Sequence, residues 1–282
     1  MPDVLVDRDE LTEWLPEFID LYARRPIKRN LEGMEFNHSF AVYAVCKKLQ
    51  PATIIESGVW KGRTTWLLRQ CCPRARLECI DPEPHVRAYT AENATYHTPD
   101  FIELDWSHCD PETTLIVFDD HQSAYARVME MRWWGFRHAV FEDNYPCGQG
   151  DCYSLRKARA GCGHPKRQMS PAHARAAGTL VRAALTEPVL RSVYPRQHVV
   201  RKPNSVDRAA LARNLAIYQE LPPVLRYDTN PWGEPWRDGA ASVEPLFAGF
   251  DDSPHPQALR AVEEDEPDRA FRYAYPCYVR LT

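Results

Sequence analysis

Acidic side chains follow two apolar segments of the chain, at the point where each segment would end as a buried strand. Residues 114–118 are followed by Asp119, Asp120 and His121, and residues 138–141 by Glu142, Asp143 and Asn144. Ligands of open α/β sheets bind beyond the carboxyl ends of the strands, so both groups are expected in one crevice. Converging carboxylates repel one another unless a cation neutralises them, and oxygen ligands suit a hard cation such as Mg²⁺. We therefore expect a divalent-metal site here; the alternative is that each acid pair caps a helix or forms an Asx turn.

A glycine turn between a strand and a helix gives a second candidate site. An apolar run ends in Glu56, the turn contains Gly58 and Gly62, and Thr64 opens a helical pattern. Glycine lets a ligand approach the backbone closely, and the free N–H groups of the helix face that ligand. The G-x-x-x-G spacing differs from the G-x-G-x-x-G of pyrophosphate sites, and the G-K-S/T of a P-loop is missing from this turn. An acid before the first glycine suits an ammonium group or ribose hydroxyls. The candidate cofactor contacts are therefore Glu56, Gly58, Trp60, Gly62 and Thr64, with an ordinary strand–turn–helix as the alternative.

Two further acids extend the cofactor hypothesis. Asp81 ends a second apolar run, 75–80, roughly 20 residues after the glycine turn, where a carboxylate commonly grips a ribose diol. The alternative is that Asp81 only starts a turn with Pro82. A third run, 101–104, is predicted as a strand that ends at Asp105 and Trp106, where an acid could meet an adenine amine and a ring could stack on the base.

The segment 37–145 resembles the class I S-adenosylmethionine-dependent methyltransferases. It is most similar to the metal-dependent small-molecule O-methyltransferases and to the family of cephalosporin hydroxylase-like proteins and macrolide-sugar O-methyltransferases. The motifs that carry the resemblance are IIESGVWKG, CIDPEP, FDDH and FEDN. The resemblance implies an α/β fold with a Rossmann-like, mostly parallel seven-stranded sheet flanked by helices. It also implies S-adenosylmethionine as cofactor, and a metal held by Asp119 or Asp120 and by Asp143, with Glu142 or Asn144.

The sequence departs from this family at the general base. Catechol-type members carry a lysine shortly after the acid of the fourth strand, whereas this chain has Asp120, His121, Gln122 and Ser123. A neutral imidazole is a competent base near pH 7, so His121 and Asp120 are the candidate catalytic residues. The alternative is that His121 is only a structural partner of the neighbouring acids.

Helices are expected before this core, in a cap formed by residues 1–50. Six apolar residues of the segment 11–22 recur at helical spacing, with Pro16 expected in a first turn, and residues 36–49 form a second apolar helix. Just before and within that second helix lie Glu35, Asn37 and His38. They could contact the cofactor as part of a lid, or form a loop with Asn37 as the N-cap.

After the core, 51–165, residues 166–282 are expected to complete the sheet and the substrate pocket within one integrated domain. Helices are predicted at 172–185, after Ser170-Pro171, and at 206–221, after Ser205, and a strand is predicted at 277–281. Aromatic residues of the proline-rich stretch 221–256, among them Trp232 and Trp236, form a satellite core or line a planar substrate.

A polar loop with the sequence CGQGDC follows the metal acids and is expected to wrap the site. Its Asp151, with Tyr153 and Ser154, is predicted to shape the substrate pocket. A zinc site formed by Cys147, Cys152, Cys162 and His164 is the weaker alternative, because no C-x-x-C pair is present in this segment.

The composition is that of an intracellular enzyme. The chain has 282 residues, 44% hydrophobic, and a net charge of −4, which gives no electrostatic reason to expect nucleic acid or an anionic membrane as partner. The first residues have neither the basic nor the apolar region of a signal peptide, and no run approaches the length of a membrane span. Nine scattered cysteines, an odd number, predict reduced thiols and a cytoplasmic location.

The leading hypothesis is metal-assisted methyl transfer from S-adenosylmethionine to a hydroxyl of a small-molecule acceptor, by a monomer or a homodimer. One alternative keeps the fold and metal site for other chemistry, as in a hydrolase or lyase; the missing lysine and the CGQGDC loop favour it. The other is a non-catalytic cofactor-binding module. Two acid pairs that are costly to hold together without a cation speak against the binding module.

Overall fold

A seven-stranded sheet forms the centre of the computed structural model, which describes residues 4–31, 33–162, 206–231, 233 and 243–282. The strands are β1 (Thr53–Ser57), β2 (Arg76–Ile80), β3 (Ala94–His97), β4 (Thr114–Phe118), β5 (His138–Phe141), β6 (Leu215–Glu220) and β7 (Cys277–Leu281). Their order is β3-β2-β1-β4-β5-β7-β6. Strand β7 runs antiparallel to β5 and β6, and all the other pairs are parallel. The predicted α/β class with a mostly parallel, Rossmann-like seven-stranded sheet is therefore confirmed.

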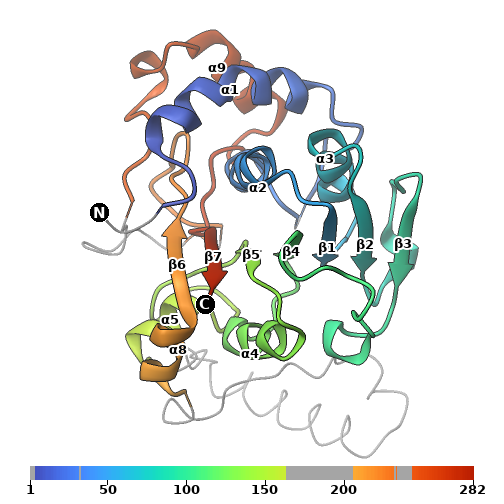
Figure 1. Ribbon diagram of the computed structural model, residues 1–282. Helices are drawn as coiled ribbons and strands as arrows, with labels where there is room; N and C mark the ends of the chain where they lie inside the picture. The colour runs from blue at the N-terminus through green and yellow to red at the C-terminus, as the bar shows by residue number, and fades with distance from the viewer. Residues whose placement is uncertain (1–3, 32, 163–205, 232, 234–242) are drawn as a thin grey trace, which may run out of the picture.

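Helices cover both faces of the sheet (Figure 1). They are α1 (Arg8–Ala23), α2 (Phe36–Leu49), α3 (Arg63–Cys71), α4 (Ala124–Trp134), α5 (Leu155–Ala160), α8 (Arg208–Asn214) and α9 (Pro256–Asp265), with short 3₁₀ turns at η1 (Pro84–Val86), η2 (Phe101–Glu103) and η4 (Phe250–Asp252). Helices α2 and α3 pack on one face beneath α1 and α9, and α4, α5 and α8 pack on the other. No helix among these described residues is both long enough and apolar enough to cross a membrane.

The central strands are mostly apolar because both of their faces are buried. Ile54 and Leu115 point into the core under α2 and α3, whereas Ile55 and Ile116 point into the core under α4. This alternation is the two-residue period of a strand, and a parallel sheet covered on both sides favours apolar side chains on both faces.

Most of the predicted elements are present at the predicted residues. The helix over 36–49 and the strands over 114–118, 138–141 and 277–281 are confirmed. Helix α4 also ends as predicted, because Gly135 adopts the left-handed conformation with φ +80° at its C-cap. Pro16, however, lies inside α1 rather than in its first turn, which begins after the N-cap Asp7.

Two element predictions are wrong. Residues 101–103 form η2, not a strand, because the Asp100 carboxylate accepts a hydrogen bond from the Ile102 N–H and makes a capping box with Glu103; β3 lies earlier in the chain. The helix predicted over 206–221 stops at Asn214, and the chain continues as β6, which pairs along β7. Tertiary strand pairing has overridden the local helical pattern there. The helix predicted at 172–185, with Ser170 and Ser205, and the residues Trp232 and Trp236 lie outside the described residues.

Candidate functional site

The largest of the cavities described here opens where the strand order reverses, between β1 and β4. Ser57 pairs with Phe118 and with Ile80 at the carboxyl ends of β1, β4 and β2, so the loops after these strands start at the same level. Open α/β sheets bind ligands at such a switch point. This cavity, termed the switch-point cavity, has a volume of about 770 Å³. Its wall is formed by Ser57, Gly58, Trp60, Ile80, Asp81, Pro82, Glu83, Thr98, Pro99, Asp100, Ile102, Glu103, Asp119, Asp120, His121 and Gln122.

The glycine turn contacts two neighbouring segments, the backbone at Asp119 and the side chain of Asp81. Gly58 has φ +98°, and a Cβ built on it would lie 2.0 Å from the carbonyl oxygen of Asp119, so this position requires glycine. The carboxylate of Asp81 accepts hydrogen bonds from the backbone N–H groups of Val59, at 3.0 Å, and Trp60, at 2.6 Å. Its other oxygen accepts from the Glu83 N–H at 2.7 Å. Asp81 therefore lines the cavity mainly as the support of the turn.

Three of the predicted cofactor residues, Gly58, Trp60 and Asp81, line the switch-point cavity. The other members of the turn do not. Gly62, with φ +90°, lies against the carbonyl of Tyr89, and Thr64 is buried in α3. Glu56 is buried beneath α3, where it accepts a hydrogen bond from the Thr65 hydroxyl at 2.6 Å. Burial raises the pKa of Glu56 to about 8.

The structure does not bring Asp105 and Trp106 to the cavity, which corrects that expectation. Asp105 is exposed. Trp106 is buried in the core under α4, where its ring stacks on Phe101 and its Nε1–H donates to the Phe101 carbonyl at 2.9 Å. The assignment failed because it placed both residues at the end of a strand that does not exist. The 3₁₀ turn η2 instead directs Ile102 and Glu103 to the cavity wall.

Three potential metal ligands converge beside this cavity, and two of them, Asp119 and His121, line it. Ligand atoms of Asp119, His121 and Asp143 all lie within 4.8 Å of one another. His121 Nδ1 is 3.2 Å from Asp143 Oδ2 and 3.1 Å from an oxygen of Asp151. The backbone of His121 is left-handed, with φ +53°, a strained conformation that clusters at functional sites.

The electrostatics of this group fit a cation. Burial, reinforced by Glu142 and Asp143, raises the pKa of Asp119 well above its usual range. Burial and then Asp143 do the same to the pKa of Glu142. Asp143, outweighing desolvation, raises the pKa of His121 well above 6.5. The role of His121 as a neutral base stays a prediction. Two carboxylates with an imidazole, beside a third buried acid, form a donor set that a divalent cation would satisfy.

Asp120 and Asn144, two of the predicted metal ligands, bond to other residues and do not join this group. Asp120 accepts hydrogen bonds from Nε of Arg127 at 3.0 Å and from the Ser57 hydroxyl at 2.7 Å. The Asn144 amide donates to the Tyr218 hydroxyl at 2.8 Å and accepts from the backbone N–H of Arg156 at 2.9 Å. Asp120 is neutralised by a buried arginine and Asn144 is fully buried, so Asp119, Asp143 and Glu142 remain as the candidate acids.

A second cavity, termed the acceptor cavity, is lined by all three potential metal ligands, Asp119, His121 and Asp143, which are termed the metal-binding group. Its volume is about 350 Å³, and it shares Asp119 and His121 with the switch-point cavity. Its wall is formed by Gly33, Met34, Glu35, His38, Asp119, His121, Glu142, Asp143, Tyr145, Pro231, Arg269 and Arg272. Glu35 and His38, two of the three residues predicted as lid or cofactor contacts, are among them. The third predicted residue, Asn37, does not line the cavity and does not cap α2. Its side chain bonds to the backbone of Val224 and Leu225.

His38 is held in one tautomer. Its Nε2 accepts a hydrogen bond from the Ala274 N–H at 2.9 Å, so the proton of the neutral ring lies on Nδ1, which contacts Glu142 Oε1. Burial lowers the pKa of His38, which favours this neutral form. Sequence patterns did not identify Arg269 and Arg272 as site residues, because they follow α9, far along the chain from the acids.

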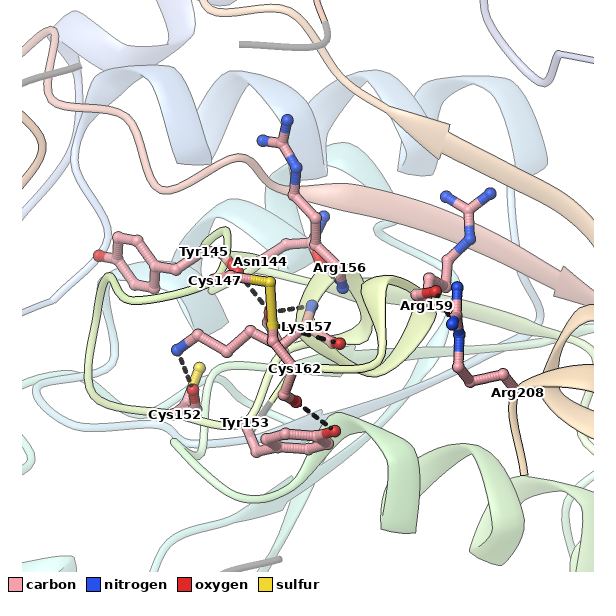
Figure 2. The surroundings of a disulfide bond; sticks show 11 residues. Asn144, Tyr145, Cys147, Cys152, Tyr153, Arg156, Lys157, Arg159, Cys162 and Arg208 are labelled. Carbon is pink, nitrogen blue, oxygen red and sulfur yellow. Dashed lines mark hydrogen bonds between the residues drawn. A yellow bond between two sulfur atoms is a disulfide. The ribbon is translucent and has the colours of Figure 1, made fainter. Parts of the chain in front are cut away.

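A disulfide between Cys147 and Cys162 closes the loop that follows the metal acids (Figure 2). The prediction that all cysteines are reduced is therefore wrong for this pair. The zinc alternative is not supported either, since a disulfide sulfur is no longer a thiolate ligand, and His164 lies outside the described residues. Inside the loop, the buried Lys157 donates to the Cys152 carbonyl at 2.6 Å.

Of the loop residues predicted to shape the substrate pocket, only Asp151 reaches the site, through His121. Tyr153 is buried in the core under α4, and its hydroxyl donates to the Cys162 carbonyl at 3.0 Å. Ser154 is buried and caps α5. Tyr153 and Ser154 thus stabilise the loop through their buried contacts.

No protein-family model and no curated protein matches the chain. Several solved structures are similar to part of the chain at low identity. CmcI without ligand is 20% identical over 51% of this chain and 70% of its own, with a TM-score of 0.33. CmcI in an Mg-SAM complex is 23% identical over 51% and 70%, with a TM-score of 0.29. An O-methyltransferase from Bacillus cereus in complex with SAH is 13% identical over 50% and 68%, with a TM-score of 0.30. At these scores, the case for a function rests on the site itself.

Proposed function

We propose that this protein transfers a methyl group from S-adenosylmethionine to a hydroxyl of a small molecule, with the help of a divalent cation. The observation that carries the proposal is the position of Asp119 and His121 in the wall of both cavities. A cofactor in the switch-point cavity and an acceptor in the smaller cavity would meet at this wall. Holding two reactants in line at one place is the main catalytic contribution a protein can make to such a transfer.

The switch-point cavity has the polarity that this cofactor needs. S-adenosylmethionine supplies an electrophilic methyl group on a positively charged sulfonium, and its ribose offers two hydroxyls. Glu83 is the best candidate to accept from those hydroxyls, because both oxygens of Asp81 already accept backbone N–H groups. Trp60 lines the same wall, with its indole fixed by a hydrogen bond from Nε1 to the Leu31 carbonyl at 2.9 Å.

Asp119, His121 and Asp143 would hold the cation. When bound, a divalent ion lowers the pKa of a hydroxyl that it contacts and stabilises the resulting oxyanion. The two carboxylates suit Mg²⁺, as expected from the sequence, and the imidazole widens the choice to softer divalent ions.

Glu142 is the candidate proton acceptor in place of the missing lysine. It lines the acceptor cavity, and although burial raises its pKa, a bound cation would favour the ionised carboxylate that can accept the proton. His38 cannot take a further proton without losing the hydrogen bond from Ala274, so it orients Glu142 through its Nδ1 side.

Calorimetric titration of S-adenosylmethionine with Mg²⁺ or with chelator tests this proposal against its rivals. The proposal predicts cofactor binding in both conditions, and turnover to S-adenosylhomocysteine with a hydroxylic acceptor only when the cation is present. Cofactor binding without turnover on any acceptor would favour a binding module. Absence of binding in both conditions would leave the hydrolase or lyase alternative.

A further inference from the structure

The wall of the acceptor cavity carries charges of both signs. It contains the acids Asp119, Glu142 and Asp143 and the arginines Arg269 and Arg272. The two arginines differ in their partners. Arg269 donates to the Glu35 carboxylate at 2.7 Å and is thereby neutralised. Arg272 forms no ion pair with any residue that the structure describes, although its side chain lines the cavity.

The position of Arg272 is fixed relative to the metal-binding group. Its Nε donates to the Asp268 carbonyl at 3.0 Å, and its own carbonyl accepts from the Asn37 amide at 3.1 Å. Two residues later, the Ala274 N–H donates to His38, and its carbonyl accepts from the Asn144 N–H at 2.8 Å, directly after the acids of β5. The segment that carries Arg272 is thus tied to α2 and to the end of β5. A guanidinium held this way, without a direct ion-pair partner among the described residues, is preorganised for an anionic ligand, although Glu35 also feels its charge.

We propose that the acceptor is a hydroxy acid whose carboxylate binds Arg272 while its hydroxyl lies beside Asp119, His121 and Asp143. This inference rests on the proposed function and narrows its substrate class. A planar carboxylate matches the two parallel donors of a guanidinium. A single negative charge also suits a wall in which one arginine has no direct ion pair among the described residues, because the nearby acids would repel a dianion.

Matched probes test the charge requirement. Each hydroxy acid is compared with its neutral amide, 3,4-dihydroxybenzoate with 3,4-dihydroxybenzamide and mandelate with mandelamide, by calorimetry in the presence of Mg²⁺ alone. We expect the wild-type protein to bind at least one acid about 10- to 100-fold more tightly than its amide, the range of a charge-assisted pair. Arg272→Met should reduce this ratio to about one, and Arg272→Lys should retain part of it. Arg260→Met is the control. It removes an exposed arginine of α9 that pairs with Asp251 and does not line the cavity, so it should keep the full ratio.

Equal binding of acids and amides by the wild-type protein would overturn the proposal, as would a preference that survives in Arg272→Met or no binding of any probe. Thermal melts confirm that each variant is folded, and Arg272→Lys serves if Arg272→Met is not. The titrations contain no S-adenosylmethionine, so they succeed or fail independently of methyl transfer. Formation of S-adenosylhomocysteine, measured separately with the same acids, decides the proposed function itself.

Discussion

The α-carbon of Gly58 faces the carbonyl oxygen of Asp119 so closely that a Cβ would lie 2.0 Å from it. This contact joins the turn after β1 to Asp119, the first acid after β4. The fold itself therefore requires glycine at position 58, whereas the sequence suggested that glycine was needed for the approach of a ligand. The protein's own backbone occupies the space that a side chain would need.

Gly58→Ala should therefore destabilise the fold itself, by about 2–5 kcal/mol, from overlap together with a left-handed backbone. Gly135→Ala is the matched control, because Gly135 also has a positive φ, but its Cβ would meet only Pro111, at an ordinary 3.8 Å. That control should cost about 1 kcal/mol. Urea denaturation compares the two, and equal losses would refute the steric role of Asp119.

Arg127 should be a structural cation and not a part of the metal site. It is 2% exposed and pairs with Asp100, Asp120 and Glu130. Arg127→Met should lower the free energy of unfolding by about 3–5 kcal/mol, since it leaves several acids without their counter-charge. Arg137→Met breaks an exposed pair with Glu112 and should cost no more than about 1 kcal/mol. Similar losses in the two variants would contradict the assignment of Asp120 to this ion-pair cluster.

The buried Glu56 should make stability fall as pH rises. Its pKa is raised from 4.5 to about 8, so the folded state binds the proton more tightly than the unfolded state does. Stability is then fully present below the unfolded pKa and is lost progressively between pH 4.5 and about 8. Glu56→Gln cannot ionise, so the variant should gain on the wild type across this window. Melting curves at several pH values measure the difference, and parallel pH profiles would contradict the buried-acid account.

Asp119→Asn should stabilise the metal-free protein near neutral pH. The pKa of Asp119 is raised by burial and by Glu142, so its ionised form is unfavourable in the folded state. Removing the charge should gain at least about 1 kcal/mol with chelator, the scale of one pKa unit, and should abolish stabilisation by added cation. Asp119 is a cleaner test than Asp143, because Asp143 is in direct contact with His121 at 3.2 Å. The exposed Asp105→Asn is the control and should leave the cation response unchanged; a lower melting temperature of Asp119→Asn with chelator would count against the acid cluster.

The sequence predicted the strands and the acids at their ends because both depend on local patterns. It could not separate Asp119 from Asp120, because consecutive residues differ only in the direction of their side chains, and Arg127, which neutralises Asp120, lies seven residues further along the chain. Trp106 was misassigned for a related reason, since capping by Asp100 converts an apolar run into a 3₁₀ turn. Arg272 gave no sequence signal at all, because only the folded chain brings the segment after α9 beside β5.

The measurement that tests the account most directly is the formation of methylated product. The protein is incubated with S-adenosylmethionine, a mixture of hydroxy acids, and either a divalent cation or chelator, and the products are identified by mass spectrometry. The account predicts S-adenosylhomocysteine together with an acceptor heavier by one methylene unit, formed with the cation and lost with chelator and in Asp119→Asn. Cofactor turnover that is indifferent to chelator would remove the metal from the mechanism. The absence of any methylated acceptor, with the cation present and the protein folded, would contradict the proposed function.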